Sequence, residues 1–292
     1  MTQENAIGRL CIIGVGLMGG SLARALRAAG QVREVVGYGR SVEDLTQAVE
    51  LGVIDRFELD LTAAVAGANM LVLAIPVGAI APMAAQLKTC LGPDTVLTDV
   101  GSTKVSVIDS ILQGFGYVPE NFVPGHPIAG TEKKGVAASF ATLFHDRRVI
   151  LTPLPETRAE AVERVRRMWQ WTGAKVVTME PVHHDEVLAA TSHLPHVLAY
   201  TLVDALSRLH DSKEIFQYAA GGFRDFTRIA SSDPQMWHDI CLANREQIVK
   251  IMEVFRQDLE RVQQAISSGD SQTILRVFTD AQHAREHYCK HL

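Results

Sequence analysis

The run GHPIAGTEKKG at residues 125–135 holds the residue types that most clearly suggest chemistry in this sequence. Between three glycines it places a histidine, a hydroxyl, a carboxylate and two ammonium groups, at His126, Thr131, Glu132, Lys133 and Lys134. Such a stretch is too polar for a buried strand. It follows the strand-like segment 121–123, and functional groups gather at the carboxyl ends of strands in open α/β sheets. We therefore expect His126 to face a crevice at a sheet edge.

A serine is expected at the same edge. The apolar segment 95–101 is a predicted strand, and Ser102 follows it in the motif DVGSTK. A lone histidine is more often structural than catalytic. Because His126 and Ser102 both follow predicted strands of one sheet, a catalytic role for this histidine is favoured.

A dinucleotide-binding motif follows the first predicted strand. The segment GVGLMGGS places Gly14, Gly16 and Gly19 in GxGxxG order, with Leu17 and Met18 inside it, after an apolar run and before a helical pattern. The first glycine permits a tight turn, the second admits the pyrophosphate, and the third allows close helix–strand packing. The helix N-terminus then offers N–H groups to phosphate, so the segment predicts nucleotide binding.

The end of the second predicted strand bears on the choice of cofactor. An acidic residue usually stands there in NAD-binding proteins and accepts a hydrogen bond from the ribose. This sequence instead has Gly39, followed by Arg40 and Ser41. A guanidinium without a carboxylate suits a 2′-phosphate, which favours NADP. NAD remains open if Arg40 is only a solvated loop charge.

The elements that must position these groups alternate along the first part of the chain. Apolar strand patterns occupy 9–16, 34–39, 70–76, 95–101 and 147–153, and helical patterns such as 21–30 and 44–52 end in glycine. Continuous apolar strands separated by helices are typical of a parallel sheet covered on both faces. The fold class predicted is α/β, with an N-terminal Rossmann-type doubly wound sheet.

The strand patterns stop after 174–179. Helical patterns then cover 184–209, interrupted or kinked at Pro195, as well as 233–266 and about 271–287. We therefore predict two domains: a dinucleotide-binding domain over 1–180 and an all-α C-terminal domain over 181–292.

Composition narrows the class of protein. The 292 residues carry a formal net charge of −5, so no global positive field favours nucleic acid or an anionic membrane. No apolar run reaches a membrane span, and the polar N-terminus does not read as a secretory signal. The cysteines are far apart and form no CxxC pair, which indicates free thiols, no metal site and a cytoplasmic location: Cys11, Cys90, Cys241 and Cys289.

With these motifs in order, the chain resembles the prephenate/arogenate dehydrogenases of tyrosine biosynthesis. The resemblance covers nearly the whole chain and rests on GVGLMGGS, DVGSTK, GHPIAGTEKKG, VILTP, TSHLPH and GGFRDFTRIASSDPQMW. It implies a Rossmann domain followed by a helical domain that forms a homodimer. It also implies oxidative decarboxylation of prephenate or arogenate to 4-hydroxyphenylpyruvate or tyrosine, with hydride transfer to NADP or NAD.

The resemblance also assigns roles. His126 matches the histidine that accepts the substrate hydroxyl proton, and Ser102 matches the position that orients this hydroxyl. Arg228 matches the anchor of a substrate carboxylate, with a surface ion pair to Asp225 as the alternative. His193 matches a second polar contact to the substrate, and Thr131 a pocket-lining position. His196 is expected to be structural, and Trp237 to pack in the helical domain and help close the pocket.

Some relatives carry additional domains. We expect neither a chorismate mutase segment before the dinucleotide domain nor a regulatory domain after the helices. Any feedback by tyrosine would then act at the active site. The residues do not distinguish prephenate from arogenate, which differ only in a keto or amino group.

Two alternatives remain open on the residues alone. A β-hydroxyacid dehydrogenase would also join such a dinucleotide domain to a helical one, but it needs a catalytic lysine on a helix, and 185–209 contains none. A non-catalytic NADP-binding sensor would have no need of the polar residues Ser102 and His126.

Overall fold

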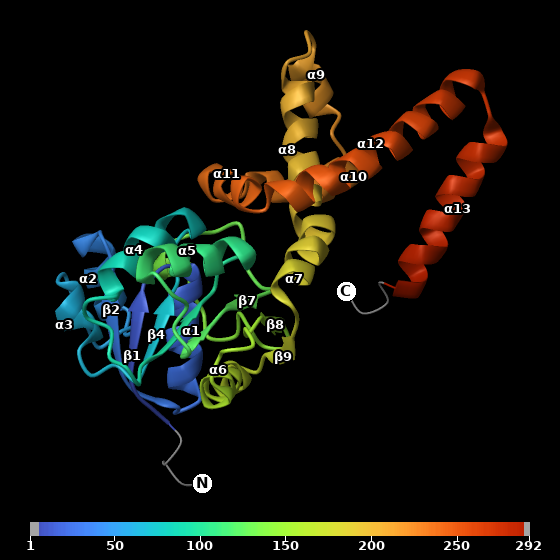
Figure 1. The fold of residues 1–292 in the computed structure, drawn as a ribbon. Coiled ribbons are helices and arrows are strands. Elements are labelled where there is room, and N and C mark those ends of the chain that lie inside the picture. The colour runs from blue at the N-terminus through green and yellow to red at the C-terminus, as the bar shows by residue number, and fades with distance from the viewer. Residues whose placement is uncertain (1–5, 289–292) are drawn as a thin grey trace. The chain divides into compact units, whose positions relative to one another are not determined.

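A six-stranded parallel sheet forms the centre of the first part of the chain (Figure 1). The computed structural model describes residues 6–288. The sheet has the order β3-β2-β1-β4-β5-β6, which is the Rossmann order with its reversal between β1 and β4. Its strands are β1 (Ile7–Ile13), β2 (Val32–Tyr38), β3 (Arg56–Glu58), β4 (Met70–Leu73), β5 (Val96–Asp99) and β6 (Phe122–Val123). The predicted doubly wound sheet is confirmed.

Alternation along β1 explains why helices cover both faces of this sheet. Leu10 and Ile12 pack into one apolar cluster, whereas Cys11 and Ile13 pack into a second one. The first cluster includes α1 (Leu17–Ala28), α2 (Val42–Glu50) and α6 (Ala159–Trp171). The second includes α3 (Leu61–Val65), α4 (Ile80–Leu87) and α5 (Val105–Phe115). Strands buried on both sides read as the continuous apolar runs seen in the sequence.

A second sheet of three strands corrects the expectation that 147–153 belongs to the main sheet. It has the order β7-β8-β9, with β7 (Gly125–Pro127) antiparallel to β8 (Arg148–Leu151) and β9 (Lys175–Thr178) parallel to β8. The chain changes sheets at Pro124, directly after β6. Proline has no backbone N–H, so it cannot extend the ladder with β5. This change of sheet sets the position of His126, which pairs with Ile150.

The chain after β9 is helical, as predicted. Five α-helices lie between Pro181 and Ala243. They are α7 (Pro181–Leu188), α8 (Leu194–Ser207), α9 (Ser212–Gln217), α10 (Gly221–Thr227) and α11 (Pro234–Ala243), with a 3-10 turn η5 (Arg228–Ser231). The interruption expected at Pro195 is a π-helical turn, η4 (Ala189–His193), just before it. A proline cannot donate to the residue four positions earlier and its ring crowds that carbonyl, which a wider turn accommodates.

The helix expected over 233–266 is two helices. α11 ends at Ala243, Asn244 leaves the helical conformation with φ −115° and ψ 30°, and α12 (Arg245–Ser268) begins after it. Helix α13 (Ser271–Tyr288) agrees closely with the predicted last helix. The chain divides into two compact units between Arg245 and Glu246. The predicted border at 180/181 is a different division, between the dinucleotide-binding domain and the helical domain. It stays a prediction.

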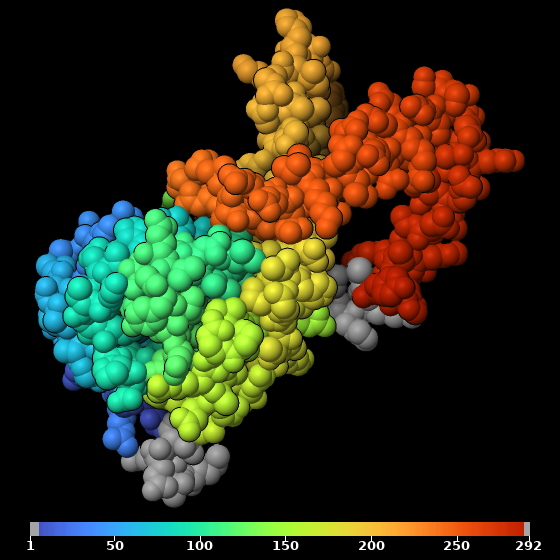
Figure 2. Space-filling model, in the orientation of Figure 1, coloured from blue at the N-terminus to red at the C-terminus, as the bar shows by residue number. Residues whose placement is uncertain are grey.

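The second unit consists of α12 and α13. Figure 2 shows the two helices, orange-red and dark red, diverging from the turn that joins them, with open space between them. Large apolar side chains are exposed along both: Val249, Phe255, Leu259, Ile266, Leu275 and Phe278. Among the described residues, no helix is long and apolar enough to cross a membrane.

Candidate active site

The glycine motif forms a cradle at the end of β1. Gly14 has φ 94°, and a Cβ there would lie 2.3 Å from the Ala74 carbonyl oxygen. A Cβ on Gly19 would lie 2.4 Å from the Gly14 carbonyl oxygen. A Cβ on Gly16 would instead meet no atom within 4 Å, so open space faces that backbone. The motif therefore combines tight packing with room for a ligand at the N-terminus of α1, which fits a pyrophosphate.

The other predicted cofactor residues flank this cradle. Leu17 and Met18 begin α1 and pack, partly buried, against the first apolar cluster. Arg40 is exposed after β2. Ser41 caps α2, since its Oγ accepts a hydrogen bond from the Asp44 amide at 3.1 Å. The positions 39–41 contain no carboxylate, although Glu43 and Asp44 follow in the first turn of α2.

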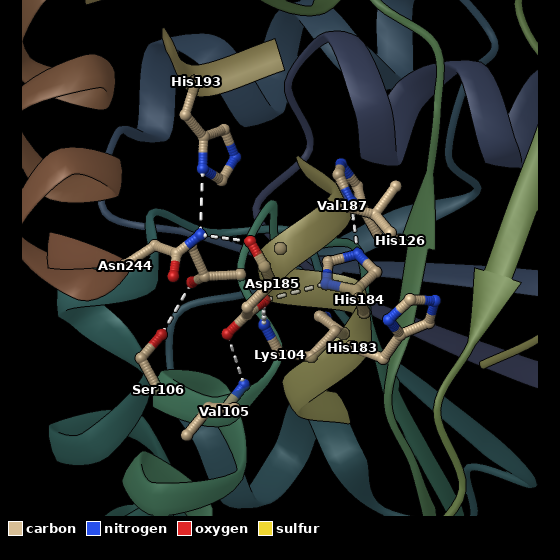
Figure 3. Close-up of polar contacts among 12 residues, drawn as sticks. Lys104, Val105, Ser106, His126, His183, His184, Asp185, Val187, His193 and Asn244 are labelled. Atoms are coloured by element: carbon tan, nitrogen blue, oxygen red, sulfur yellow. Dashed lines mark hydrogen bonds and ion pairs between the residues drawn. The ribbon is translucent and has the colours of Figure 1, made fainter. Parts of the chain in front are cut away.

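His126 is the end of a buried relay (Figure 3). Its side chain lies on β7 and is 9% exposed. His126 Nδ1 lies 2.9 Å from His184 Nε2, and His184 Nδ1 lies 2.8 Å from Asp185 Oδ1. The Asp185 carboxylate also accepts hydrogen bonds from the backbone amides of Lys104, at 2.8 Å, and Val105, at 3.0 Å. Each side chain in this relay is thus fixed by at least one hydrogen bond to a buried partner.

The relay determines the tautomers of both histidines. A carboxylate only accepts, so His184 Nδ1 carries the proton that it donates to Asp185. Neutral His184 then accepts at Nε2, and His126 Nδ1 must be the donor between the two rings. The lone pair of His126 is consequently at Nε2. Among the described residues no hydrogen bond to that nitrogen is formed.

Burial keeps both rings neutral. Desolvation lowers the pKa of His126 well below its ordinary 6.5, and the nearby His184 and Lys104 lower it further. Desolvation also lowers the pKa of His184, against the opposing effect of its hydrogen bond to Asp185. A neutral imidazole with a free Nε2 is the form that can accept a proton.

Ser102 lies at the edge predicted for it, just after β5 and partly buried. Asp99 connects the loop that holds it to β7. One oxygen of that carboxylate accepts from the Gly101 amide at 2.7 Å, and the other accepts from the Gly125 amide at 3.0 Å. The residues directly before Ser102 and directly before His126 therefore share one buried partner.

His193 is buried next to the relay. Asn244 donates from Nδ2 to the Asp185 backbone carbonyl at 2.8 Å and to His193 Nδ1 at 3.1 Å. His193 therefore carries its proton on Nε2, which is buried and has no partner among the described residues. Desolvation lowers the pKa of His193 to about 4. Its Nε2–H is a free donor in a buried position, which suits an acceptor on a ligand.

Two aromatic rings extend this cluster. His196 stacks on Trp237 with ring centroids 3.6 Å apart and planes at 19°, and His193 meets the same indole edge-on at 6.1 Å. Trp237 Nε1 is a second buried donor without a partner in the described residues. His196, expected only to be structural, therefore lies in the same cluster as His193.

Arg228 lies at the far end of the cluster. Its side chain is 62% exposed and pairs at 3.4 Å with Glu132, rather than with Asp225, the alternative partner on the sequence. Its charge lowers the pKa of His196, whose main cause of lowering is desolvation. Thr131 is exposed and its Oγ1 accepts from the Lys133 amide at 3.2 Å, while Lys134 lies 3.4 Å from Asp233. The polar run that begins at His126 therefore contacts the helical segment that contains Arg228 and Asp233.

Four members of this cluster are not predicted by any sequence motif: Lys104, His184, Asp185 and Asn244. They come from separate segments and match no spacing template. The adjacent His184 and Asp185, at the start of a helix after the last strand, were the one local signal. No group of three or more His, Cys, Asp or Glu able to hold a metal occurs in residues 6–288.

Comparison with known proteins adds family information to this geometry. The family model described as prephenate dehydrogenase, nucleotide-binding domain, matches residues 22–178. The model described as prephenate dehydrogenase, dimerization domain, matches residues 180–280. A cyclohexadienyl dehydrogenase from Zymomonas mobilis is 40% identical over 281 residues, which are 94% of each chain.

Solved structures agree with the sequence matches. A prephenate dehydrogenase from A. aeolicus, in complex with hydroxyphenyl propionate and NAD+, has a TM-score of 0.89 and 36% identity, covering 96% of this chain and 97% of that one. An arogenate dehydrogenase from Synechocystis has a TM-score of 0.80 and 28% identity, covering 96% and 99%. These matches favour a prephenate/arogenate dehydrogenase over a β-hydroxyacid dehydrogenase and over a non-catalytic NADP-binding sensor.

Proposed function

This chain belongs to the prephenate dehydrogenase family, and we propose that His126 is the base of its reaction, the oxidative decarboxylation of prephenate, arogenate or both. The reaction removes a proton from the substrate's 4-hydroxyl and a hydride from the carbon that bears it. The ring carboxylate departs as CO2, and the ring becomes aromatic. The products are 4-hydroxyphenylpyruvate from prephenate and tyrosine from arogenate.

One observation carries the assignment of the base: the relay from Asp185 through His184 to His126. It leaves Nε2 of His126 unprotonated and holds the ring in one orientation. A positioned neutral imidazole can accept the hydroxyl proton as the hydride leaves. The positive charge that then develops on His126 is stabilised through His184 by the Asp185 carboxylate.

The remaining groups bind and orient the substrate in this proposal. Ser102 donates to, or accepts from, the 4-hydroxyl and directs it toward His126. Arg228 pairs with a substrate carboxylate, for which its planar guanidinium is suited. The free Nε2–H of His193 gives a second polar contact, and Thr131, next to the Glu132 that pairs with Arg228, lines the substrate pocket. A carboxylate that must depart as CO2 should be positioned without strong stabilisation.

A nicotinamide cofactor, when bound, supplies the hydride acceptor. The glycines Gly14, Gly16 and Gly19 would hold its pyrophosphate at the N-terminus of α1, beside Leu17 and Met18. We propose a preference for NADP, supported by the exposed Arg40 and the missing carboxylate at positions 39–41. Ser41 caps α2 by accepting at Oγ, which leaves its O–H free to donate to a 2′-phosphate.

We also propose a homodimer formed through the helical domain and a cytoplasmic location. The exposed apolar side chains of α12 and α13 support the dimer, because such a surface is rarely left in water. The three described cysteines are free thiols, which suits a reducing compartment; Cys289 lies outside the described residues.

The test is a side-by-side assay of prephenate and arogenate with NAD+ and with NADP+, followed by the absorbance of the reduced nicotinamide. We expect turnover of at least one of the two substrates and a larger kcat/KM with NADP+. Absence of turnover with both substrates and both cofactors would contradict the proposed function. An equal kcat/KM for the two cofactors, unchanged in Arg40→Ala, would contradict only the NADP preference.

A further inference from the structure

A fully buried ion pair contacts the backbone next to Ser102 and His126. Asp99, at the end of β5, pairs with Lys104, and neither side chain is exposed to solvent. Burying two charges costs desolvation free energy, and apolar side chains of similar size usually stabilise an interior as well or better. This pair is therefore more significant for the backbone groups that it positions than for the stability of the fold.

The Asp99–Lys104 pair holds the backbone on both sides of the site. Asp99 accepts from the Gly101 amide at 2.7 Å and from the Gly125 amide at 3.0 Å. Lys104 Nζ donates to the Gly125 carbonyl at 2.7 Å. Both polar backbone groups of Gly125 are thus fixed by the pair, and Gly125 directly precedes His126.

Close packing makes these contacts specific. A Cβ on Gly101 would lie 2.9 Å from the Asp99 carboxylate, and a Cβ on Gly125 would lie 3.2 Å from the Asp99 backbone oxygen. Glycine at both positions lets the carboxylate reach the two amides. The backbone amide of Lys104 donates in turn to Asp185 at 2.8 Å, which connects the pair to the relay.

We propose that Asp99, neutralised by Lys104, is a positioning residue for the dehydrogenase reaction, which sets the Ser102 loop and the His126 strand relative to each other. The proposal rests on the proposed function, since it assigns Asp99 to those two residues. Asp99 touches neither side chain and acts through the backbone. A displacement of about 1 Å between reacting groups can cost about 100-fold in rate, so one shared carboxylate can control turnover.

Asp99→Asn tests the proposal. An amide keeps the shape of the side chain but offers one oxygen, so either Gly101 or Gly125 loses its acceptor. We expect kcat to fall about 10- to 100-fold, with KM and the dissociation constant of the nucleotide within about twofold of the wild type. The matched control is Thr95→Val, which removes a buried 2.9 Å hydrogen bond to the Ala68 carbonyl just before the same strand. It should leave kcat within about twofold.

A double-mutant cycle separates positioning from general loss of stability. If Asp99 acts on turnover through His126, Asp99→Asn should lower kcat much less in a His126→Asn background than in the wild type. Its effect on the melting temperature should be the same in both backgrounds. An equal fold-loss of kcat in the two backgrounds would overturn the proposal, as would an unchanged kcat in Asp99→Asn.

Asp99→Asn/Lys104→Met keeps the test decisive if the single variant does not fold, because it removes the unpaired buried ammonium. This variant should fold and bind nucleotide but still show the reduced kcat; full turnover in it would overturn the positioning role. Failure of the proposed function has a different signature. In that case His126→Asn alone would retain full turnover, whatever the result for Asp99.

Discussion

The buried relay and the exposed rim of the site are built on opposite principles. In the relay, His126, His184 and Asp185 are buried, and each holds the next through a hydrogen bond shorter than 3.0 Å. At the rim, Arg228 pairs with Glu132 and Lys134 with Asp233, both at 3.4 Å and between largely solvated groups.

The difference indicates a division of work. Hydrogen bonds and charges act strongly in a low-dielectric interior, whereas solvated pairs contribute little and rearrange easily. The interior is thus suited to fix a tautomer and an orientation. At the rim, Arg228 would give up only a solvated 3.4 Å contact with Glu132 if it paired with a ligand carboxylate.

The largest expected effect lies in the relay. His126→Asn should lower kcat by about 100- to 10,000-fold, since amide nitrogen cannot accept the hydroxyl proton. Nucleotide affinity should be unchanged, because the cradle at Gly14–Gly19 is untouched. Single-turnover kinetics and nucleotide titration provide the measurement. His183→Asn, next to the relay but 61% exposed, is the control and should retain activity; equal turnover in the two variants would refute the assigned base.

A smaller effect, on binding, is expected at the rim. Arg228→Ala should raise KM about 10- to 100-fold with a modest change in kcat, because a hydrogen bond to a charged group contributes about 1.5–3 kcal/mol. Steady-state kinetics at a saturating cofactor concentration would measure it. Lys134→Ala removes another rim cation and should leave KM nearly unchanged. If the two variants shift KM equally, Arg228 has no specific part in anchoring the substrate.

The buried histidines should also make the free energy of unfolding fall at acidic pH. His193 has a pKa of about 4 in the folded chain and 6.5 ordinarily, so the unfolded chain binds the proton first as the pH falls. The stability linked to this group is present above pH 6.5 and is lost on the way down to about pH 4. The lowered pKa values of His126 and His184 act in the same direction.

Denaturant titrations at several pH values would measure this loss. The free energy of unfolding should decline between pH 6.5 and pH 4, and His193→Gln should make the decline shallower. The wild type is the reference for this slope. A decline as steep in His193→Gln as in the wild type would contradict the burial of a neutral His193.

Local patterns in the sequence predicted the fold where one segment carries the whole signal. The spacing of Gly14, Gly16 and Gly19 after an apolar run identified the nucleotide cradle, and the apolar strands identified a sheet covered on both faces. The predicted strand at 147–153 exists, but it pairs with β7 and β9 instead of the main sheet. Pro124 causes that change, and strand pairing over long sequence separations leaves no local pattern.

The site was predictable only in its parts that follow strands. His126 and Ser102 come shortly after predicted strands of the main sheet, so their approach to one end of that sheet could be inferred from topology. That His126 itself lies on β7 of the second sheet could not. The relay could not be inferred, because His184 lies 58 residues beyond His126 and reaches it through tertiary packing. The break at Asn244 likewise leaves no local pattern, and Asn244 reaches Asp185 and His193 through tertiary contacts.

The protonation state of His126 tests the central claim most directly. Nitrogen NMR of the isotope-labelled histidines at neutral pH, with His126→Asn to assign its signals, reports on each ring nitrogen separately. We predict that Nδ1 of His126 is protonated and that Nε2 is not. A proton on Nε2, in either the other tautomer or the imidazolium, would contradict the account of this site.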